Sequence, residues 1–377
     1  MEFTGLDLIS AITLFLLIFL STILITSKKS TTSSRILGSF LLLNALNLSG
    51  GLLFISDVIL QRPSLAFWTN TLPLTFGPLL WIYTRDILFR DFEYSRKLVW
   101  HFVPFIVSFI LLIIFYHIQP RVQKLEILQM ARTSERSSLP VVVTTLVFYG
   151  HIMIYLVICW MDITRYRKDL YNRYSSLDSI SVRWLMLLIG LYGFVILVAL
   201  INSLVGFSER AYIYEISLIG LVIAILFFAS STLYRALTFP HFFKGIPRQK
   251  IRYSNNRLPQ DTVRNIRKSL YEVVDQDELY KKAYLSLDDL AIRLNTTPRV
   301  LSQILNQEIG MTFFDYINKK RIYEAMNQLS DPKLHDLTVL QIMYDVGFNS
   351  KSSFNTAFKK FTGKTPSEYR KIKGSTS

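Results

Sequence analysis

The stretch GFNSKSSFNTAFKKFTGKTP, from Gly347 to Pro366, contains no acidic residue and combines basic and small polar side chains with an apolar stripe. Phe354, Phe358 and Phe361 recur at i, i+4 and i+7, which predicts a helix with one buried face. The other faces of this helix carry Lys351, Ser352, Asn355, Thr356 and Lys359. Such a helix fits the major groove of DNA, where short polar side chains read base edges and basic side chains attract phosphate.

A shorter helix is predicted just before it, so that the two form a helix-turn-helix. Thr338 and Gln341 have the spacing of a capping box, in which each side chain accepts a hydrogen bond from the other residue's backbone at a helix start. Gly347 makes the turn. The expected buried positions of this helix are Leu340 or Val339, Ile342, Met343 and Val346.

The same pattern occurs once more upstream. Ser286 and Asp289 mark a helix start, Asn295 tolerates the left-handed conformation of a tight turn, and Thr297-Pro298 begin the next helix. The buried positions of the two helices are Leu287, Leu290, Ala291, Leu294, Val300, Leu301, Ile304 and Leu305. The opposite face of the second helix presents Arg299, Ser302, Gln303 and Asn306.

One helix is predicted between the two copies, within MTFFDYINKKRIYEAMNQL, from Met311 to Leu329. At the standard rise, about 17 residues span roughly 26 Å, so this helix can hold two recognition helices near one turn of DNA apart. A single pair would be a weak signal, since a small helical bundle with a solvated basic face has the same pattern. Two capped copies with such a spacer favour DNA binding.

At these residues the sequence resembles the AraC/XylS family of transcription regulators. The match to the family's carboxy-terminal signature consists of Gly347, Phe348, Ser350, Phe354, Phe358, Lys359, Gly363, Pro366, Tyr369 and Arg370. Upstream, the matching residues are LDDLAIRLNTTPRVLSQIL, Gly310, Ile317, Arg321 and Ala325. The resemblance covers less than a third of the chain.

The resemblance implies two helix-turn-helix units in successive major grooves. Carried over by position, it gives as base-reading candidates Arg299, Ser302, Gln303, Asn306, Lys351, Ser352, Asn355 and Thr356, with Lys359 beside them. Two departures stand out. Met343 replaces a small alanine, and Asn306-Gln307 replace residues that are often basic, which weakens the expected phosphate contact of the first motif.

The composition of the 377-residue chain divides it into an apolar front and a basic rear. The whole chain is 51% hydrophobic, and its mean hydropathy is +0.32. Residues 241–377 carry 23 basic and 14 acidic side chains, a balance that indicates a polyanionic partner, either nucleic acid or an anionic membrane surface. The single cysteine, Cys159, cannot form an internal disulfide, and zinc-ligand spacings are absent from the sequence.

The front predicts seven membrane-spanning helices, each near the 20 apolar residues that a bilayer requires. They are Leu8–Thr26, Ile36–Leu60, Leu65–Tyr83, Leu98–Ile118, Leu139–Met161, Trp184–Phe207 and Tyr212–Tyr234. The third contains Asn70, Pro73 and Pro78 and is expected to be kinked and packed among its neighbours, so that six is the alternative count.

The basic residues of the short connections predict the orientation of these helices. With the amino terminus outside, the inner connections hold 12 basic residues and the outer connections hold six. An odd number of spans then places the carboxy-terminal domain in the cytoplasm. The predicted division is a transmembrane sensor and dimerisation domain at 1–235, a basic linker at 236–260 and a DNA-binding domain at 261–377.

Several polar residues lie at apparent membrane depth. Asn44, Asn47, His151, Asn202 and Glu215 are candidates for a sensing site, and Asp57 lies near a span end. Each must find a partner or a wet cavity because burial of an unpaired polar group is costly. The alternative is that they form ordinary hydrogen bonds between helices.

The sequence thus predicts an all-α chain, a polytopic transmembrane bundle followed by an all-helical domain with two helix-turn-helix motifs. Its predicted function is that of a one-component transcription regulator at the bacterial inner membrane, with no cofactor, metal or catalytic site. The expected partners are promoter DNA, membrane lipid, a second copy of the chain and RNA polymerase. The alternatives are a receptor whose tail binds protein and an intramembrane enzyme that uses His151 or Glu215.

Overall fold

The computed structural model of the chain describes residues 5–27, 30–89, 92–132, 139–176, 182–207, 211–238 and 258–374. These residues form helices and connections, with one isolated β-bridge and no strand among them. They divide into two compact units. The first comprises Met1–Ile163 with Val182–Arg248, and the second comprises Thr164–Ser181 with Gln249–Ser377. The predicted all-α class is confirmed.

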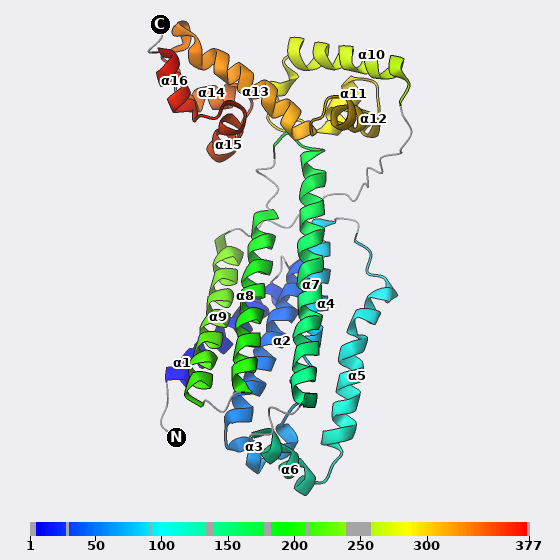
Figure 1. Ribbon diagram of the computed structural model, residues 1–377, viewed down its shortest axis with the longest axis vertical. Coiled ribbons are helices and arrows are strands. Elements are labelled where there is room, and N and C mark those ends of the chain that lie inside the picture. Colours follow the sequence, from blue (N-terminus) through cyan, green and yellow to red (C-terminus); the bar gives the residue numbers. More distant parts are fainter. Residues whose placement is uncertain are drawn as a thin grey trace. The chain divides into compact units, whose positions relative to one another are not determined.

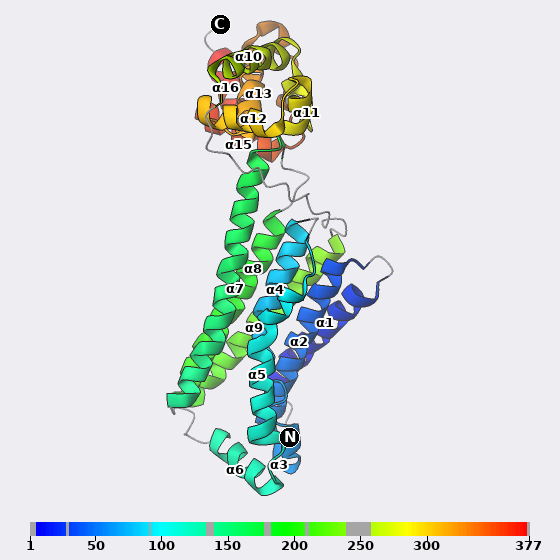
Figure 2. The ribbon, with the colours of Figure 1, turned by 90° about the vertical axis from the view of Figure 1, so that its right-hand side faces the viewer.

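The first unit contains the apolar helices (Figures 1 and 2). They are α1 (Gly5–Thr26), α2 (Thr32–Ile55), α3 (Val58–Gln61), η1 (Pro63–Leu65), α4 (Pro73–Leu88), η2 (Arg96–Phe102), α5 (Val103–Leu112), η3 (Ile113–His117), α6 (Arg121–Arg132), α7 (Leu139–Tyr171), α8 (Val182–Gly206) and α9 (Ala211–Thr238). Helix α1 packs against α2 and α9, α8 against α9, and α2 against α4. Six helical stretches of the described residues are long and apolar enough to cross a membrane.

The packing of this unit places large apolar side chains on its outside. Phe15, Phe115, Ile154 and Phe227 are each more than half exposed. Inside, the ring of Phe40 on α2 lies 4.8 Å from that of Tyr192 on α8 and also contacts rings from α4 and α9. A small aromatic core therefore joins four helices whose outer surfaces remain apolar.

The predicted third span differs from the structure. Residues 65–83 do not form one helix, because a turn containing Phe67, whose φ is +66°, precedes Pro73, the first residue of α4. Helix α4 has 16 residues, about 24 Å at the standard rise, and includes Pro78. Most of its side chains are buried, as expected for a helix packed among its neighbours. Gly77 permits this packing, since a Cβ there would lie 2.7 Å from the ring of Tyr155 on α7.

The second unit contains eleven helical elements among its residues 258–374. They are α10 (Gln260–Tyr271), η5 (Glu272–Gln276), η6 (Leu279–Lys281), α11 (Leu287–Arg293), α12 (Pro298–Gln303), η7 (Ile304–Glu308), α13 (Phe313–Ser330), η8 (Pro332–Leu334), α14 (Val339–Asp345), α15 (Lys351–Thr362) and α16 (Pro366–Gly374). Two hydrophobic clusters form its core. Helix α13 contributes Phe313 and Ile317 to the first and Ile322, Ala325 and Leu329 to the second, and so joins the two halves.

The boundaries of the two units differ from the expected division in one respect. Residues 164–181, at the end of α7 and beyond it, cluster with the carboxy-terminal unit, although the sequence suggested only a connection between two spans. Within the predicted linker 236–260, residues 239–257 lie outside the described part of the chain.

The turn at Gly347 supplies a test of this fold. A Cβ at Gly347 would lie 2.6 Å from the carbonyl oxygen of Lys281, and its φ is +92°. Gly363 also has a positive φ, +75°, but open space around it. We expect Gly363→Ala to lower the free energy of unfolding by about 1 kcal/mol through backbone strain alone. Gly347→Ala should cost roughly 3 kcal/mol, since it adds a steric clash.

Pulse proteolysis of the purified full-length chain in urea, with cleavage followed within residues 258–374, measures both values. Equal losses for the two variants would contradict the close approach of Gly347 to the Lys281 carbonyl.

Candidate nucleic-acid interface

The second helix-turn-helix has the local structure that its sequence predicts. The Thr338 hydroxyl accepts a hydrogen bond from the backbone N–H of Gln341 at 3.1 Å, and the Gln341 side chain accepts one from the N–H of Thr338 at 2.8 Å. Gly347 makes the left-handed turn, and Ser350 caps the start of α15. Of the alternatives at the first buried position, Val339 packs on the core while Leu340 is half exposed.

Helix α15 separates a buried face from an open one. Phe354 and Phe358 are almost completely buried, and Phe361 packs against the same cluster. On the other side the side chains of Lys351, Ser352, Thr356 and Lys359 are exposed and that of Asn355 is half-buried. Five polar or basic side chains without a carboxylate therefore occupy consecutive turns, which suits an anionic double helix.

The first helix-turn-helix also follows its predicted local chemistry. Ser286 and Asp289 form the capping box, Asn295 has a φ of +47°, and the Thr297 hydroxyl accepts a hydrogen bond from the N–H of Val300 at 3.3 Å. The predicted apolar stripe is buried at Leu287, Leu290, Ala291, Leu294, Leu301, Ile304 and Leu305, and Val300 packs partly against it.

The exposure of this first recognition helix differs from expectation. Arg299 is exposed and Asn306 is half-buried, but Ser302 is 1% exposed and Gln303 is 4% exposed. The helical spacing predicts all four on an open face. In the structure the amide of Asn306 donates to the Ser302 hydroxyl at 3.3 Å, and that of Gln303 donates to Gln307 at 2.9 Å.

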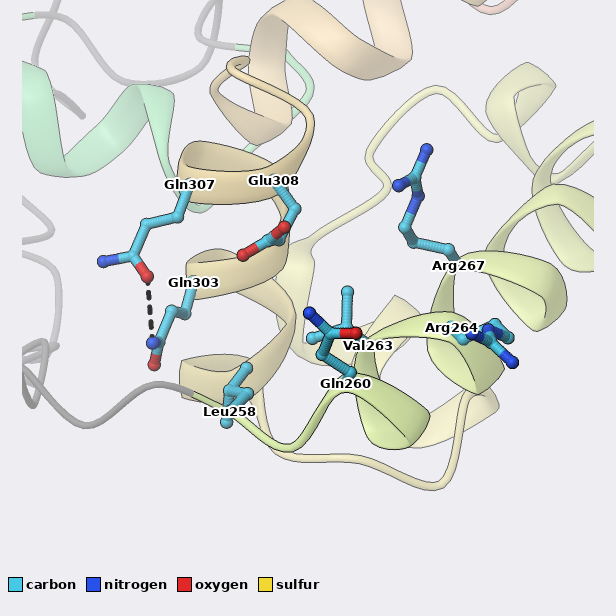
Figure 3. A pocket seen from close by; sticks show the side chains of 8 residues that line it. All are labelled: Leu258, Gln260, Val263, Arg264, Arg267, Gln303, Gln307 and Glu308. Atoms are coloured by element: carbon cyan, nitrogen blue, oxygen red, sulfur yellow. Dashed lines mark hydrogen bonds between the residues drawn. The ribbon is translucent and has the colours of Figure 1, made fainter.

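A pocket of about 650 Å³ lies between this helix and the start of α10, and its lining includes Gln303, Leu258, Gln260 and Val263 (Figure 3). The Gln303 side chain points toward Gln307, with which it is hydrogen-bonded (Figure 3). The base-reading roles of Ser302 and Gln303 stay predictions, and in this conformation these two side chains are closed to a large ligand.

Arg321 on α13 holds the two motifs together. Its guanidinium is 0% exposed and donates to the backbone oxygens of Tyr280 at 2.7 Å and Lys282 at 2.9 Å, between the two halves of the domain. It also donates to the side chain of Asn318 at 3.1 Å and lies over the Phe348 ring at 5.4 Å. Burial lowers the pKa of Arg321 to about 10, so the group remains charged at neutral pH. Its partners are neutral oxygens, which compensate the lost hydration.

A second link between α13 and the recognition helix α15 is an ion pair. The Nζ atom of Lys360 lies 2.6 Å from Oδ1 of Asp315. Lys360 is exposed, so this pair is screened by solvent and contributes at most about 1 kcal/mol to stability. It removes Lys360 from the set of cations that face outward and leaves Lys351 and Lys359 on the open side of α15.

The polar residues predicted for sensing do not come together in one site. The Asn44 amide donates to the Phe40 carbonyl at 2.8 Å and accepts from the Tyr192 hydroxyl, and Asn202 donates to Ser217 at 2.7 Å. The His151 ring lies 5.0 Å from the Tyr155 ring, and its buried Nδ1 has no hydrogen-bond partner among the residues that the structure describes.

The two other candidates lie at the surface of their helices. Asn47 is half-buried on α2 and Glu215 is exposed on α9. Among the described residues no hydrogen bond joins any two of the five candidates, and no cluster of three potential metal ligands occurs there. A sensing role for them stays a prediction.

Comparison with known proteins agrees with the assignment of the carboxy-terminal motifs. A family model described as a helix-turn-helix domain matches residues 290–372. The HTH-type transcriptional activator AarP of Providencia stuartii is 36% identical over 86 residues, which are 23% of this chain and 62% of that protein. The uncharacterised HTH-type transcriptional regulator YtdP of Bacillus subtilis is 34% identical over 91 residues, 24% of this chain and 11% of that protein.

Among solved structures, the C-terminal domain of AraT, a response regulator from Geobacillus stearothermophilus, is 30% identical. The match covers 32% of this chain and 88% of that chain, with a TM-score of 0.25. The family model thus assigns a helix-turn-helix domain to residues 290–372 of the chain. It spans less than two thirds of the length of the curated relatives it matches.

The bonds of Arg321 predict the effect of a conservative substitution. Arg321→Lys keeps the charge but cannot direct donors to Tyr280, Lys282 and Asn318 at once, because an ammonium lacks the planar fork of the guanidinium. We expect the free energy of unfolding of the domain to fall by roughly 2–4 kcal/mol, the loss typical of unsatisfied buried acceptors beside a charge.

Hydrogen–deuterium exchange of the full-length chain reports this as faster exchange of backbone amides on both α11 and α14. The control is Lys360→Ala, which removes an exposed ion pair on the same helix interface and should change exchange little. If Arg321→Lys exchanged like Lys360→Ala, the guanidinium would not join the two motifs.

Proposed function

We propose that this chain is a membrane-bound, sequence-specific DNA-binding transcription regulator that senses and responds within one polypeptide. The observation that carries the proposal is the combination of two capped helix-turn-helix motifs with six helices apolar enough to cross a bilayer. The relatives matched at the carboxy-terminal domain bear the names of transcription regulators, which supports DNA as the partner of that domain.

The exposed face of α15 supplies the chemistry of recognition. In the proposed complex Asn355 and Thr356 hydrogen-bond base edges in the major groove, while Lys351 and Lys359 attract phosphate. Arg299, Ser302, Gln303 and Asn306 perform the corresponding task from the first motif. Helix α13, with 18 residues and about 27 Å at the standard rise, fixes the separation of the two recognition helices near one turn of DNA.

The apolar exterior of the first unit supports insertion into a membrane. Side chains such as Phe15, Phe115 and Phe227 would be costly to expose to water on this scale but lie favourably against lipid. The polar residues Asn44 and Asn202 are satisfied within the helices, as a lipid-embedded bundle requires. Membrane lipid is thus the proposed environment of the first unit.

The proposed orientation places the amino terminus outside and the DNA-binding domain in the cytoplasm. The bias of basic residues supports it, with Arg165, Arg167, Lys168 and Arg173 all within or just after the carboxy-terminal end of α7. A second argument is independent of charge. Ser175, just after α7, is hydrogen-bonded to Leu285, Asn318 and Arg321, which supports a common side of the bilayer for the end of α7 and the DNA-binding domain.

The proposed role of the bundle is to sense a stimulus and to bring two copies of the chain together. One DNA-binding domain alone is expected to bind weakly, and a dimer held by the bundle would raise the effective concentration at paired sites. RNA polymerase is a further proposed partner at the promoter. Asn44, Asn47, His151, Asn202 and Glu215 remain the sensing candidates.

Two other function classes make different predictions for a chain that lacks residues 258–377. An intramembrane enzyme would keep its activity without the tail, whereas a transcription regulator would lose its control of promoters. A receptor whose tail binds protein would lose signalling, but the full-length chain would show no preference among DNA sequences. Selection of duplexes from a random DNA library by the purified chain distinguishes this receptor from a DNA-binding regulator.

We expect the double substitution Asn355→Ala with Thr356→Ala to lower affinity for selected duplexes by about 1–3 kcal/mol per lost base contact. Affinity for random duplexes should change little, because phosphate contacts persist. Lys351→Ala is the matched comparison on the same face, and it should weaken both kinds of duplex and reduce the salt slope by about one. Fluorescence anisotropy across a salt series measures all three effects. Equal loss on every sequence for the double variant would make Asn355 and Thr356 scaffold residues.

Membrane insertion and orientation are tested together in vesicles from expressing cells. The carboxy-terminal domain should stay with the membrane after alkaline washing, and an added protease should cleave it in inside-out vesicles only. Cleavage at the amino terminus in right-side-out vesicles serves as the matched control. Protection of the carboxy-terminal domain in inside-out vesicles, with cleavage in right-side-out vesicles, would reverse the proposed topology.

A further inference from the structure

Residues 171–176, the last residue of α7 and the five that follow it, lie against the DNA-binding domain. The backbone N–H of Ser175 donates to the carbonyl of Leu285 at 3.1 Å, and the N–H of Leu287 donates to the carbonyl of Arg173 at 2.8 Å. These two bonds flank an antiparallel bridge between Tyr174 and Ser286. The segment therefore pairs with the chain just before α11, in the way one β-strand pairs with another.

Ser175 also contacts the helix that joins the two motifs. Its carbonyl accepts hydrogen bonds from Asn318 at 3.1 Å and Arg321 at 3.3 Å, and its hydroxyl donates to Leu285 at 2.7 Å. Ser175, Asn318 and Arg321 are each at most 1% exposed. Part of the hydrogen-bonding capacity of the buried Arg321 is thus satisfied by a residue that belongs, in sequence, to the connection between α7 and α8.

An aromatic contact extends this docked region. The ring of Tyr171, the last residue of α7, meets that of Phe314 near the start of α13 at 4.8 Å in an edge-to-face arrangement. Leu170 and Asn172 are buried beside it. The interface is specific, because it combines backbone pairing, a buried serine and an aromatic pair.

Helix α7 connects this interface to the apolar bundle. Asp162 of α7 is buried and forms an ion pair with Arg85 of α4 at 2.9 Å. Only Ile163 to Leu170 separate Asp162 from Tyr171, and this stretch is helical and contains neither glycine nor proline. Helix α7 is thus continuous from the Arg85–Asp162 ion pair to the docked segment.

The same structure leaves the first recognition helix closed, with Ser302 and Gln303 at most 4% exposed. We infer that residues 171–176 act as an autoinhibitory docking strand, which holds the domain in a form with low affinity for DNA and releases it when α7 moves. The inhibitory part of this inference rests on the proposed function, whereas the docking itself does not.

A disulfide between the paired residues tests the docking. Tyr174 and Ser286 form a non-hydrogen-bonded pair, whose Cα atoms lie about 4.5 Å apart in an antiparallel bridge. We expect Tyr174→Cys with Ser286→Cys, in the full-length chain in lipid nanodiscs, to form a disulfide under mild oxidation, detected by mass spectrometry of its digest. The matched control is Lys168→Cys with Ser286→Cys, where Lys168 is an exposed residue of α7 outside the bridge.

The locked and reduced forms of the same molecule test the inhibition. The probe is a duplex selected from a random library by the reduced double-cysteine protein. We expect oxidation to weaken its binding at least tenfold and reductant to restore it. Ser175→Pro, which lacks the N–H that bonds Leu285, should bind the probe at least threefold more tightly than the unmodified chain, and Ser175→Ala should lie between them.

The outcomes separate the inference from the proposed function. Equal disulfide yields in the test and control pairs would overturn the docking. A specific disulfide with unchanged DNA affinity would overturn the inhibition and leave the docking in place. If no form of the chain bound any duplex above the affinity of a neutral protein, the proposed function would fail, and the inhibitory role with it.

Discussion

The buried guanidinium of Arg321 is the interaction on which the DNA-binding domain depends. Charge cannot be placed in an apolar interior unless oxygen atoms replace the lost water. Here the oxygens come from three places in the chain: the loop around Tyr280 and Lys282, Asn318 on the same helix, and Ser175 beyond α7. Each of these segments supplies part of the replacement for that water. One side chain thereby makes the two motifs and the docked segment interdependent.

The first unit is constrained differently, because its outer surface is apolar. Its core is small, with aromatic rings from four helices around Phe40, and its outer surface is the apolar one. In the proposed lipid environment the hydrophobic effect would not drive these helices together, so close approach and internal hydrogen bonds would have to hold them. Gly77 against Tyr155, Asn202 against Ser217 and Arg85 against Asp162 are contacts of this kind. They join α4 to α7 and α8 to α9.

Local signals in the sequence were sufficient for the helices and turns of the carboxy-terminal domain. The capping pairs Ser286–Asp289 and Thr338–Gln341 and the turns at Asn295 and Gly347 depend on residues a few positions apart, and all of them occur as expected. The burial of Ser302 and Gln303 and the docking of Ser175 were not foreseen. The burial of Ser302 and Gln303 depends on how α12 packs within its domain. The docking of Ser175 depends on partners more than 100 positions away, and the segment around it is polar and resembles any connection between two helices. The short α4 was predicted only as part of a longer, kinked helix, because prolines indicate a break in a helix but not the residue at which the helix begins.

The docked segment has a consequence for the order in which the chain is made. Ser175 and Arg321 are 146 positions apart, and α8 and α9 lie between them. Synthesis proceeds from the amino terminus, so residues 171–176 are made together with the apolar helices, long before α13 leaves the ribosome. Non-local contacts of this separation form slowly in a free chain, but here one partner is already held at a fixed place. The carboxy-terminal residues that bond to Ser175 therefore meet a partner that was made earlier in the same chain.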